Sequence, residues 1–147
     1  MRKFAFNLET LLRHRTNLEE KERELLGAVY NRLQVEIGRM DRLRAKHAEV
    51  RSQLSRQELR EYDAREIGWY CTFLRRLDHE MEQTARRIQN LRRELEAQMV
   101  AWIERSKDKK VLENLRQRKE RDYRKAMDRL EQKDVDELVV TRYAREK

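Results

Sequence analysis

The stretch that decides the fold spans residues 70–102 and reads YCTFLRRLDHEMEQTARRIQNLRRELEAQMVAW. It holds a mostly apolar row whose members lie alternately four and three residues apart, namely Tyr70, Leu74, Leu77, Met81, Thr84, Ile88, Leu91, Leu95, Gln98 and Trp102. Because this spacing averages about 3.5 residues, less than the about 3.6 of a straight helix, the row stays on one face only if two helices supercoil around each other. The stretch therefore predicts one helix of a coiled coil.

A second row with similar spacing lies upstream and predicts the partner helix. Its members are Phe4, Leu8, Leu11, Arg15, Leu18, Glu22, Leu25 and Val29, and it continues less strictly through Leu33, Ile37, Met40, Leu43, His47, Val50 and Leu54. The apolar signal lapses across residues 55–66, which indicates a turn. We expect a first arm of about 4–56, a turn of about 57–66 and a second arm of about 67–140.

The position of the turn fixes which residues face each other. Folding back near residue 60 predicts that partners have residue numbers summing to about 120, so that Phe4 lies near Arg116. The second arm is longer, so residues from about 118 onward extend without a partner. We therefore predict an all-α fold, in which residues 1–147 form a single domain: a long antiparallel two-helix coiled-coil hairpin with an overhanging C-terminal helix.

The composition agrees with this prediction. Of the 147 residues 44% are charged and 38% hydrophobic, with no proline and three glycines, which is typical of coiled coils and long helices. No run is apolar enough to cross a bilayer and none resembles a signal peptide, so we expect a cytoplasmic protein without a transmembrane segment. Cys71 is the single cysteine, which excludes an internal disulfide.

The chain offers few residues for catalysis or cofactor binding. Its three glycines are scattered and do not build a phosphate-binding loop. Its three histidines are widely spaced and lack the cysteine or carboxylate arrangement of a metal site. A two-helix interface also has no pocket in which the pKa of a carboxylate would shift. We therefore expect a protein that is not an enzyme and binds no cofactor or metal.

The excess positive charge is concentrated in two segments. The net charge is +8, of which residues 1–15 contribute +3 and residues 105–125 contribute +6, whereas residues 16–104 sum to zero. The hairpin would bring the two basic segments side by side, which favours a docking surface for an acidic partner whose attraction weakens as salt rises. A hairpin that binds RNA or the ribosome is an alternative, because basic residues attract phosphates. The aromatic platform expected for single strands is missing, so we expect no nucleic acid partner.

Residues 69–74, which read WYCTFL, carry more aromatic rings than one helix interface buries. Trp69 and Phe73 lie four residues apart on a ridge beside the row, where a two-helix hairpin has no third element to cover them. One interpretation is that they wrap the flank of the interface next to the turn. The favoured interpretation is an apolar patch for a partner, because such rings are typical interface anchors. Leu77 belongs to the row and also borders this patch.

Three motifs resemble the flagellar FliJ family. They are FAFNLETLL at residues 4–12, the pattern Trp69-Tyr70-x-x-Phe73-Leu74-x-x-Leu77, and Glu131-Gln132-Lys133-x-x-Asp136-Glu137-Leu138. The resemblance implies a soluble cytoplasmic component of the flagellar type III export apparatus, peripherally associated with the inner face of the cell membrane at the flagellar base. It also implies an antiparallel coiled coil similar to the shaft of the central stalk in rotary ATPases.

The resemblance implies partners and the residues that contact them. The partners would be the export ATPase ring, whose assembly and activity family members promote, the export gate protein FlhA, and export chaperones. The gate-binding residues carried over by position would be Trp69, Phe73 and Leu77. The ring-binding residues would be Arg13, Arg15, Arg118, Lys119, Arg121, Arg124, Lys125, Gln132 and Lys133. A hairpin pairs within one chain, so we expect a monomer when the protein is alone; the remaining alternative is a purely structural coiled coil that pairs between chains.

Overall fold

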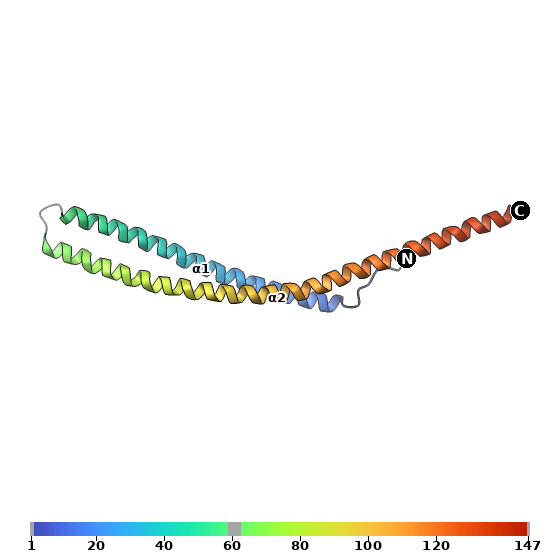
Figure 1. Cartoon of the computed structure of the whole chain (residues 1–147), viewed down its shortest axis with the longest axis horizontal. Coiled ribbons are helices and arrows are strands. Elements are labelled where there is room, and N and C mark those ends of the chain that lie inside the picture. The colour runs from blue at the N-terminus through green and yellow to red at the C-terminus, as the bar shows by residue number, and fades with distance from the viewer. Residues whose placement is uncertain (1, 59–62, 147) are drawn as a thin grey trace. The chain divides into compact units, whose positions relative to one another are not determined.

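The computed structural model describes residues 2–58 and 63–146, and nearly all of them are helical. Helix α1 is Glu9–Glu58 and helix α2 is Ala64–Arg145 (Figure 1). The two helices pack against each other and run in opposite directions, since Arg32 pairs with Glu94 whereas the later His47 pairs with the earlier Asp78. The predicted all-α hairpin is confirmed.

The ends of the helices differ slightly from the predicted ones. Helix α1 begins at Glu9 rather than near residue 4, because the preceding residues pack across α2 in a non-helical conformation. The centre of the predicted turn, residues 59–62, lies outside the described residues. On its far side the carboxylate of Asp63 accepts a hydrogen bond of 3.0 Å from the backbone N–H of Arg65, which caps the start of α2.

The chain forms two compact units, and each contains a piece of both helices. Unit 1 consists of Met1–Lys21 and Ile103–Lys147, and unit 2 consists of Glu22–Trp102. That both units act together as one coiled-coil domain stays a prediction.

Unit 2 is held together by the apolar rows that the sequence predicts. Its buried cluster consists of Leu33, Met40 and Ile88, packed by Ile37, Met81, Leu91 and Leu95. Thr84 is fully buried among these apolar side chains, and its hydroxyl donates a hydrogen bond of 2.8 Å to the carbonyl oxygen of Glu80. Because this bond satisfies the hydroxyl within α2 itself, a polar residue is tolerated in the row.

Unit 1 has its own apolar cluster, and here the predicted row is partly wrong. The buried residues are Phe6, Leu12 and Leu112, packed by Phe4, Leu8 and Leu115. Leu11, which the spacing places in the row, is exposed, and its neighbour Leu12 is buried instead. The same shift by one residue recurs well inside α1, in unit 2, where Leu25 is exposed although it was expected in the row and its neighbour Leu26 is half-buried. Every second member of the predicted row from Leu11 to Leu25 therefore lies one residue too early, whereas Val29 is buried as expected.

The pairing register also differs from the predicted one by about one to two helical turns. Arg116, the expected neighbour of Phe4, instead forms an ion pair of 3.1 Å with Glu9. Phe4 lies against Tyr123, with the ring centroids 5.7 Å apart, and the Tyr123 hydroxyl donates a hydrogen bond to the backbone carbonyl of Arg2. The N-terminal segment therefore covers α2 as far as Tyr123, beyond the predicted limit of about 118.

The last part of α2 has no covering element within the described chain. Every described residue from Asp128 to Glu146 is exposed. The predicted overhanging C-terminal helix is therefore confirmed, although it begins later than expected. Among the residues that the structure describes, no helix is long and apolar enough to cross a membrane.

Candidate functional site

The predicted aromatic patch consists of two stacked rings near the start of α2. Trp69 and Phe73 are one helical turn apart, their ring centroids are separated by 5.6 Å, and their planes differ by only 7°. Tyr70 meets the edge of Trp69 with a centroid separation of 5.2 Å and an interplanar angle of 74°. Trp69 is 62% exposed and Phe73 is half-buried, so the pair offers apolar surface within unit 2. The structure brings these two predicted residues together.

The third predicted gate-binding residue has a different environment. Leu77 is only 6% exposed and belongs to the buried interface between α1 and α2. Its side chain therefore contributes mainly to packing, and little of it is available to a partner. We use the name aromatic patch below for Trp69 and Phe73 only.

The predicted basic residues of α1 lie in unit 1 and have unequal exposure. Arg13 is exposed, whereas Arg15 is half-buried. The Nη1 atom of Arg15 donates a hydrogen bond of 2.9 Å to the backbone carbonyl of Asp108 on α2. Arg15 thus helps to hold the two helices of unit 1 together, and Arg13 is the more accessible cation.

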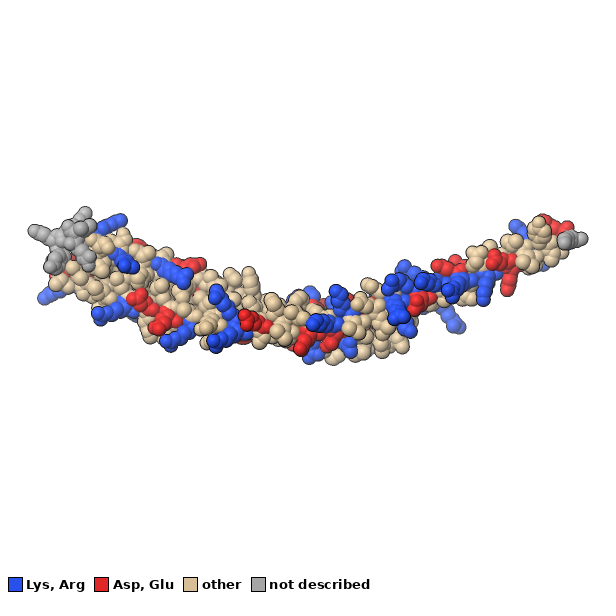
Figure 2. Space-filling model, viewed as in Figure 1, with Lys and Arg blue, Asp and Glu red and all other residues tan. Residues whose placement is uncertain are grey.

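The predicted ring-binding cations of α2 lie in the same unit, and all five are exposed: Arg118, Lys119, Arg121, Arg124 and Lys125. Figure 2 shows Lys and Arg side chains (blue) gathered along the part of α2 that is orange in Figure 1, with acidic side chains (red) between them. Arg124 is engaged in an ion pair of 3.0 Å with Glu120 one turn away. Arg118, Arg121 and Lys125 follow one ridge of the helix, so their charges point to the same side. We call these three residues the basic ridge.

The last two predicted ring-binding residues lie on the uncovered end of α2. Gln132 and Lys133 are both exposed. The amide of Gln132 donates a hydrogen bond of 3.2 Å to the carboxylate of Asp136. This contact orients the Gln132 side chain along the helix and leaves the Lys133 ammonium as the accessible charge.

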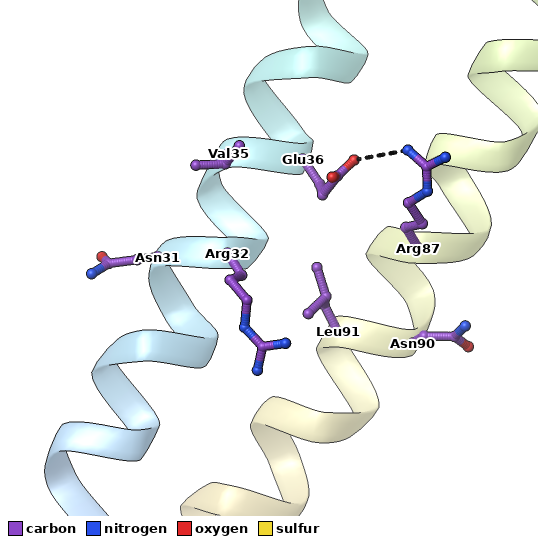
Figure 3. A pocket seen from close by; sticks show the side chains of 7 residues that line it. All are labelled: Asn31, Arg32, Val35, Glu36, Arg87, Asn90 and Leu91. Carbon is purple, nitrogen blue, oxygen red and sulfur yellow. Dashed lines mark ion pairs between the residues drawn. The ribbon is translucent and has the colours of Figure 1, made fainter.

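A groove between the helices of unit 2 was not predicted. It has a volume of about 490 Å³ and is lined by Asn31, Arg32, Val35, Glu36, Arg87, Asn90 and Leu91. Figure 3 shows Leu91 between the two helices and the Glu36–Arg87 ion pair, in which the charged atoms are 3.9 Å apart, across the groove. The exposed Val35, an apolar residue outside the predicted row, was the one sequence signal for it.

Within residues 2–58 and 63–146, no group of three or more His, Cys, Asp and Glu side chains is placed to hold a metal ion. His47 lies 2.9 Å from a carboxylate oxygen of Asp78, a contact that joins α1 to α2. The features that stand out for function are therefore the aromatic patch, the basic ridge and the uncovered end of α2.

Comparison with known proteins identifies one family. The family model described as "Flagellar FliJ protein" matches residues 4–147, which include both helices, the aromatic patch and the uncovered end of α2. No curated protein and no solved structure matches the chain.

Proposed function

The chain belongs to the flagellar FliJ family, a family of components of flagellar protein export, and we propose that it couples the export ATPase ring to the export gate by binding both. In this proposal it is a cytoplasmic, non-catalytic protein, peripherally associated with the inner face of the membrane at the flagellar base. It binds the ATPase ring in the manner of a central stalk, promotes ring assembly and activity, and contacts the gate protein FlhA and export chaperones. The observation that carries the proposal is the family match along essentially the whole chain.

Unit 1 supplies the surface that we assign to the ATPase ring. Its two helices are joined by the cluster around Phe6, Leu12 and Leu112, so the basic ridge stands on a packed support rather than on an isolated helix. Exposed cations speed the encounter with an acidic partner through long-range attraction. The uncovered end of α2, which carries Gln132 and Lys133, would gain a partner on binding.

Binding of this surface to the ATPase ring would promote ring assembly by mass action. A protein that binds the assembled ring more tightly than it binds free ATPase subunits shifts the equilibrium toward the ring. This mechanism needs no bond chemistry from the chain itself. It requires a surface that touches more than one ATPase subunit.

Unit 2 supplies the surface that we assign to the export gate. The aromatic patch contains Trp69, a large and mostly exposed ring of the kind that dominates the binding energy of many interfaces. Burial of both rings would provide the apolar part of the contact. Leu77 follows Phe73 by four residues and is buried.

The proposal is tested by co-sedimentation of the chain with its cognate export ATPase and, separately, with the purified gate protein. We expect binding to both, with ATPase binding that weakens as salt rises because exposed charges contribute to it. Absence of ATPase binding at low salt contradicts the ring assignment, and absence of gate binding contradicts the patch assignment.

The RNA or ribosome alternative rests on the same basic ridge, whose three residues are exposed. It predicts a salt-dependent mobility shift of RNA by the chain at near-physiological ionic strength. If the chain instead binds the ATPase, any binding of RNA is due to charge alone. A control peptide with the same number of Lys and Arg residues should then shift RNA equally well.

A further inference from the structure

The uncovered end of α2 carries apolar side chains that face solvent. Val135 is 53% exposed and Leu138 is 68% exposed, and no described element packs on either. A helical segment of this length is only marginally stable in water unless its apolar face is covered. The segment would therefore be stabilised by a partner that covers its apolar side chains.

One row of side chains in this segment indicates which kind of partner would fit. Alternating steps of three and four residues give Asp128, Glu131, Val135, Leu138, Arg142 and Arg145. Such spacing is that of a coiled-coil row, so these side chains share one face of α2. A shallow hollow on this face is bordered by Val135, Leu138, Arg142 and Arg145, among others. Along the row the order is acidic, acidic, apolar, apolar, basic, basic.

This order is self-complementary when two copies run antiparallel. Val135 of one copy then lies opposite Leu138 of the second copy, and Glu131 lies opposite Arg142. The next position places Asp128 opposite Arg145, and the two-fold axis repeats each pair. A parallel arrangement would instead place acidic residues against acidic residues and arginine against arginine, which is repulsive.

We propose that two copies of this chain pair antiparallel through the row from Asp128 to Arg145. Among residues 2–58 and 63–146, none of its four charged side chains forms an ion pair, so all four are available to a second copy. The sequence predicts a monomer because the hairpin pairs within one chain, and the uncovered helix adds a contact between chains. The uncovered end of α2 is the part assigned above to the ATPase ring, so a second copy and the ring would compete for it.

The contact is weak and salt-sensitive. Its apolar centre consists of only two layers, in each of which Val135 packs on Leu138 of the second copy. The flanking ion pairs are partly open to solvent and are screened as salt rises. Dimers therefore form at high protein concentration and low ionic strength, and they dissociate on dilution or on addition of salt.

Sedimentation equilibrium of the full chain over a series of concentrations tests the proposal. We expect Glu131→Lys to weaken the dimer on the order of tenfold, since two symmetric attractions become repulsions. Arg142→Glu should weaken it to a similar extent. The double variant with both changes should restore the dimer, because the swapped charges attract again. Glu137→Lys makes the same change in charge outside the row and should leave dimerisation unaltered.

Three outcomes would overturn the proposal. One is a chain that stays monomeric at every concentration at low salt. Another is a Glu131→Lys variant that dimerises as well as the unaltered chain while circular dichroism shows equal helicity. The third is a double variant that fails to recover, which would show that charge pairing across the contact is not what holds the copies together.

Discussion

Trp69 and Phe73 stack with nearly parallel, laterally displaced rings on the surface of α2, their centroids 5.6 Å apart and their planes 7° from parallel. Stacking holds each ring in one orientation before any partner arrives. Less side-chain entropy is then lost on binding than for two mobile rings. The pair is thus suited to serve as a rigid apolar anchor in unit 2.

Replacement of both rings should abolish most of the binding to the export gate. We expect the variant Trp69→Ala with Phe73→Ala to lose at least about 2 kcal/mol of binding free energy, as is typical of central aromatic anchors. Titration calorimetry with the purified gate protein measures the loss, and circular dichroism checks that helicity is retained.

A matched control for the aromatic patch is Tyr30→Ala. Tyr30 is also exposed in unit 2 but lies on α1 outside the patch. It should retain gate affinity. Equal losses in the patch variant and in this control would show that the patch is not a specific contact.

Leu77 should behave as a residue of the helix interface. Because it is buried, Leu77→Ala should lower the free energy of unfolding by about 2–5 kcal/mol. Val35→Ala, a change at an exposed site in the same unit, should alter it by no more than about 0.5 kcal/mol. Urea denaturation followed by circular dichroism measures both, and similar values for the two variants would refute this assignment of Leu77.

The basic ridge should control the rate of association with the ATPase. Reversal of charge in Arg118→Glu with Arg121→Glu should slow association on the order of tenfold at low salt, and the difference should shrink as salt rises. The variant Arg39→Glu with Arg42→Glu makes the same change at the same spacing on exposed residues of unit 2. Stopped-flow binding should show little effect of this control; equal slowing would mean that only net charge matters.

The buried carboxylate of Glu19 should contribute to the stability of unit 1. It is only 2% exposed, and its carboxylate lies 3.7 Å from the ammonium of Lys109. Removal of one member of a buried charged pair leaves the other without its compensating charge, so we expect Glu19→Leu to lower the free energy of unfolding by about 2 kcal/mol.

Urea denaturation of the full chain, followed by circular dichroism, measures this change in the free energy of unfolding. The variant Glu20→Leu, at the exposed neighbouring residue, is the control. The control should stay within about 0.5 kcal/mol of the unaltered chain. A Glu19→Leu variant that is as stable as the unaltered chain, or more stable, would contradict the role assigned to this carboxylate.

The fold was predictable because its determinants are local and repeated. The row from Tyr70 to Trp102 keeps one phase over many turns, and the structure buries Leu77, Thr84 and Ile88 of this row as expected. The exposed Trp69 was predictable for the same reason, since a residue that lies outside a two-helix row has nothing to cover it.

The register and the N-terminal packing were not predictable from the same pattern. The register depends on the geometry of the turn, which no proline or glycine specifies within residues 55–66. Leu11 and Leu12 are adjacent leucines, as are Leu25 and Leu26, so residue type does not tell which member of each pair is buried. The groove beside Leu91 depends in turn on the register, so the apolar rows did not predict its position and the exposed Val35 was its one sequence signal.

The most direct test of the coupling proposal is a titration of the cognate export ATPase with this chain while ATP hydrolysis and ring formation are followed together. A central stalk acts once per ring, so we expect both signals to rise and to saturate at a ratio well below one chain per ATPase subunit. The basic-ridge variant Arg118→Glu with Arg121→Glu should need more protein to reach the same plateau. No increase in either signal at low salt, or saturation only at one chain per subunit, would contradict the proposal.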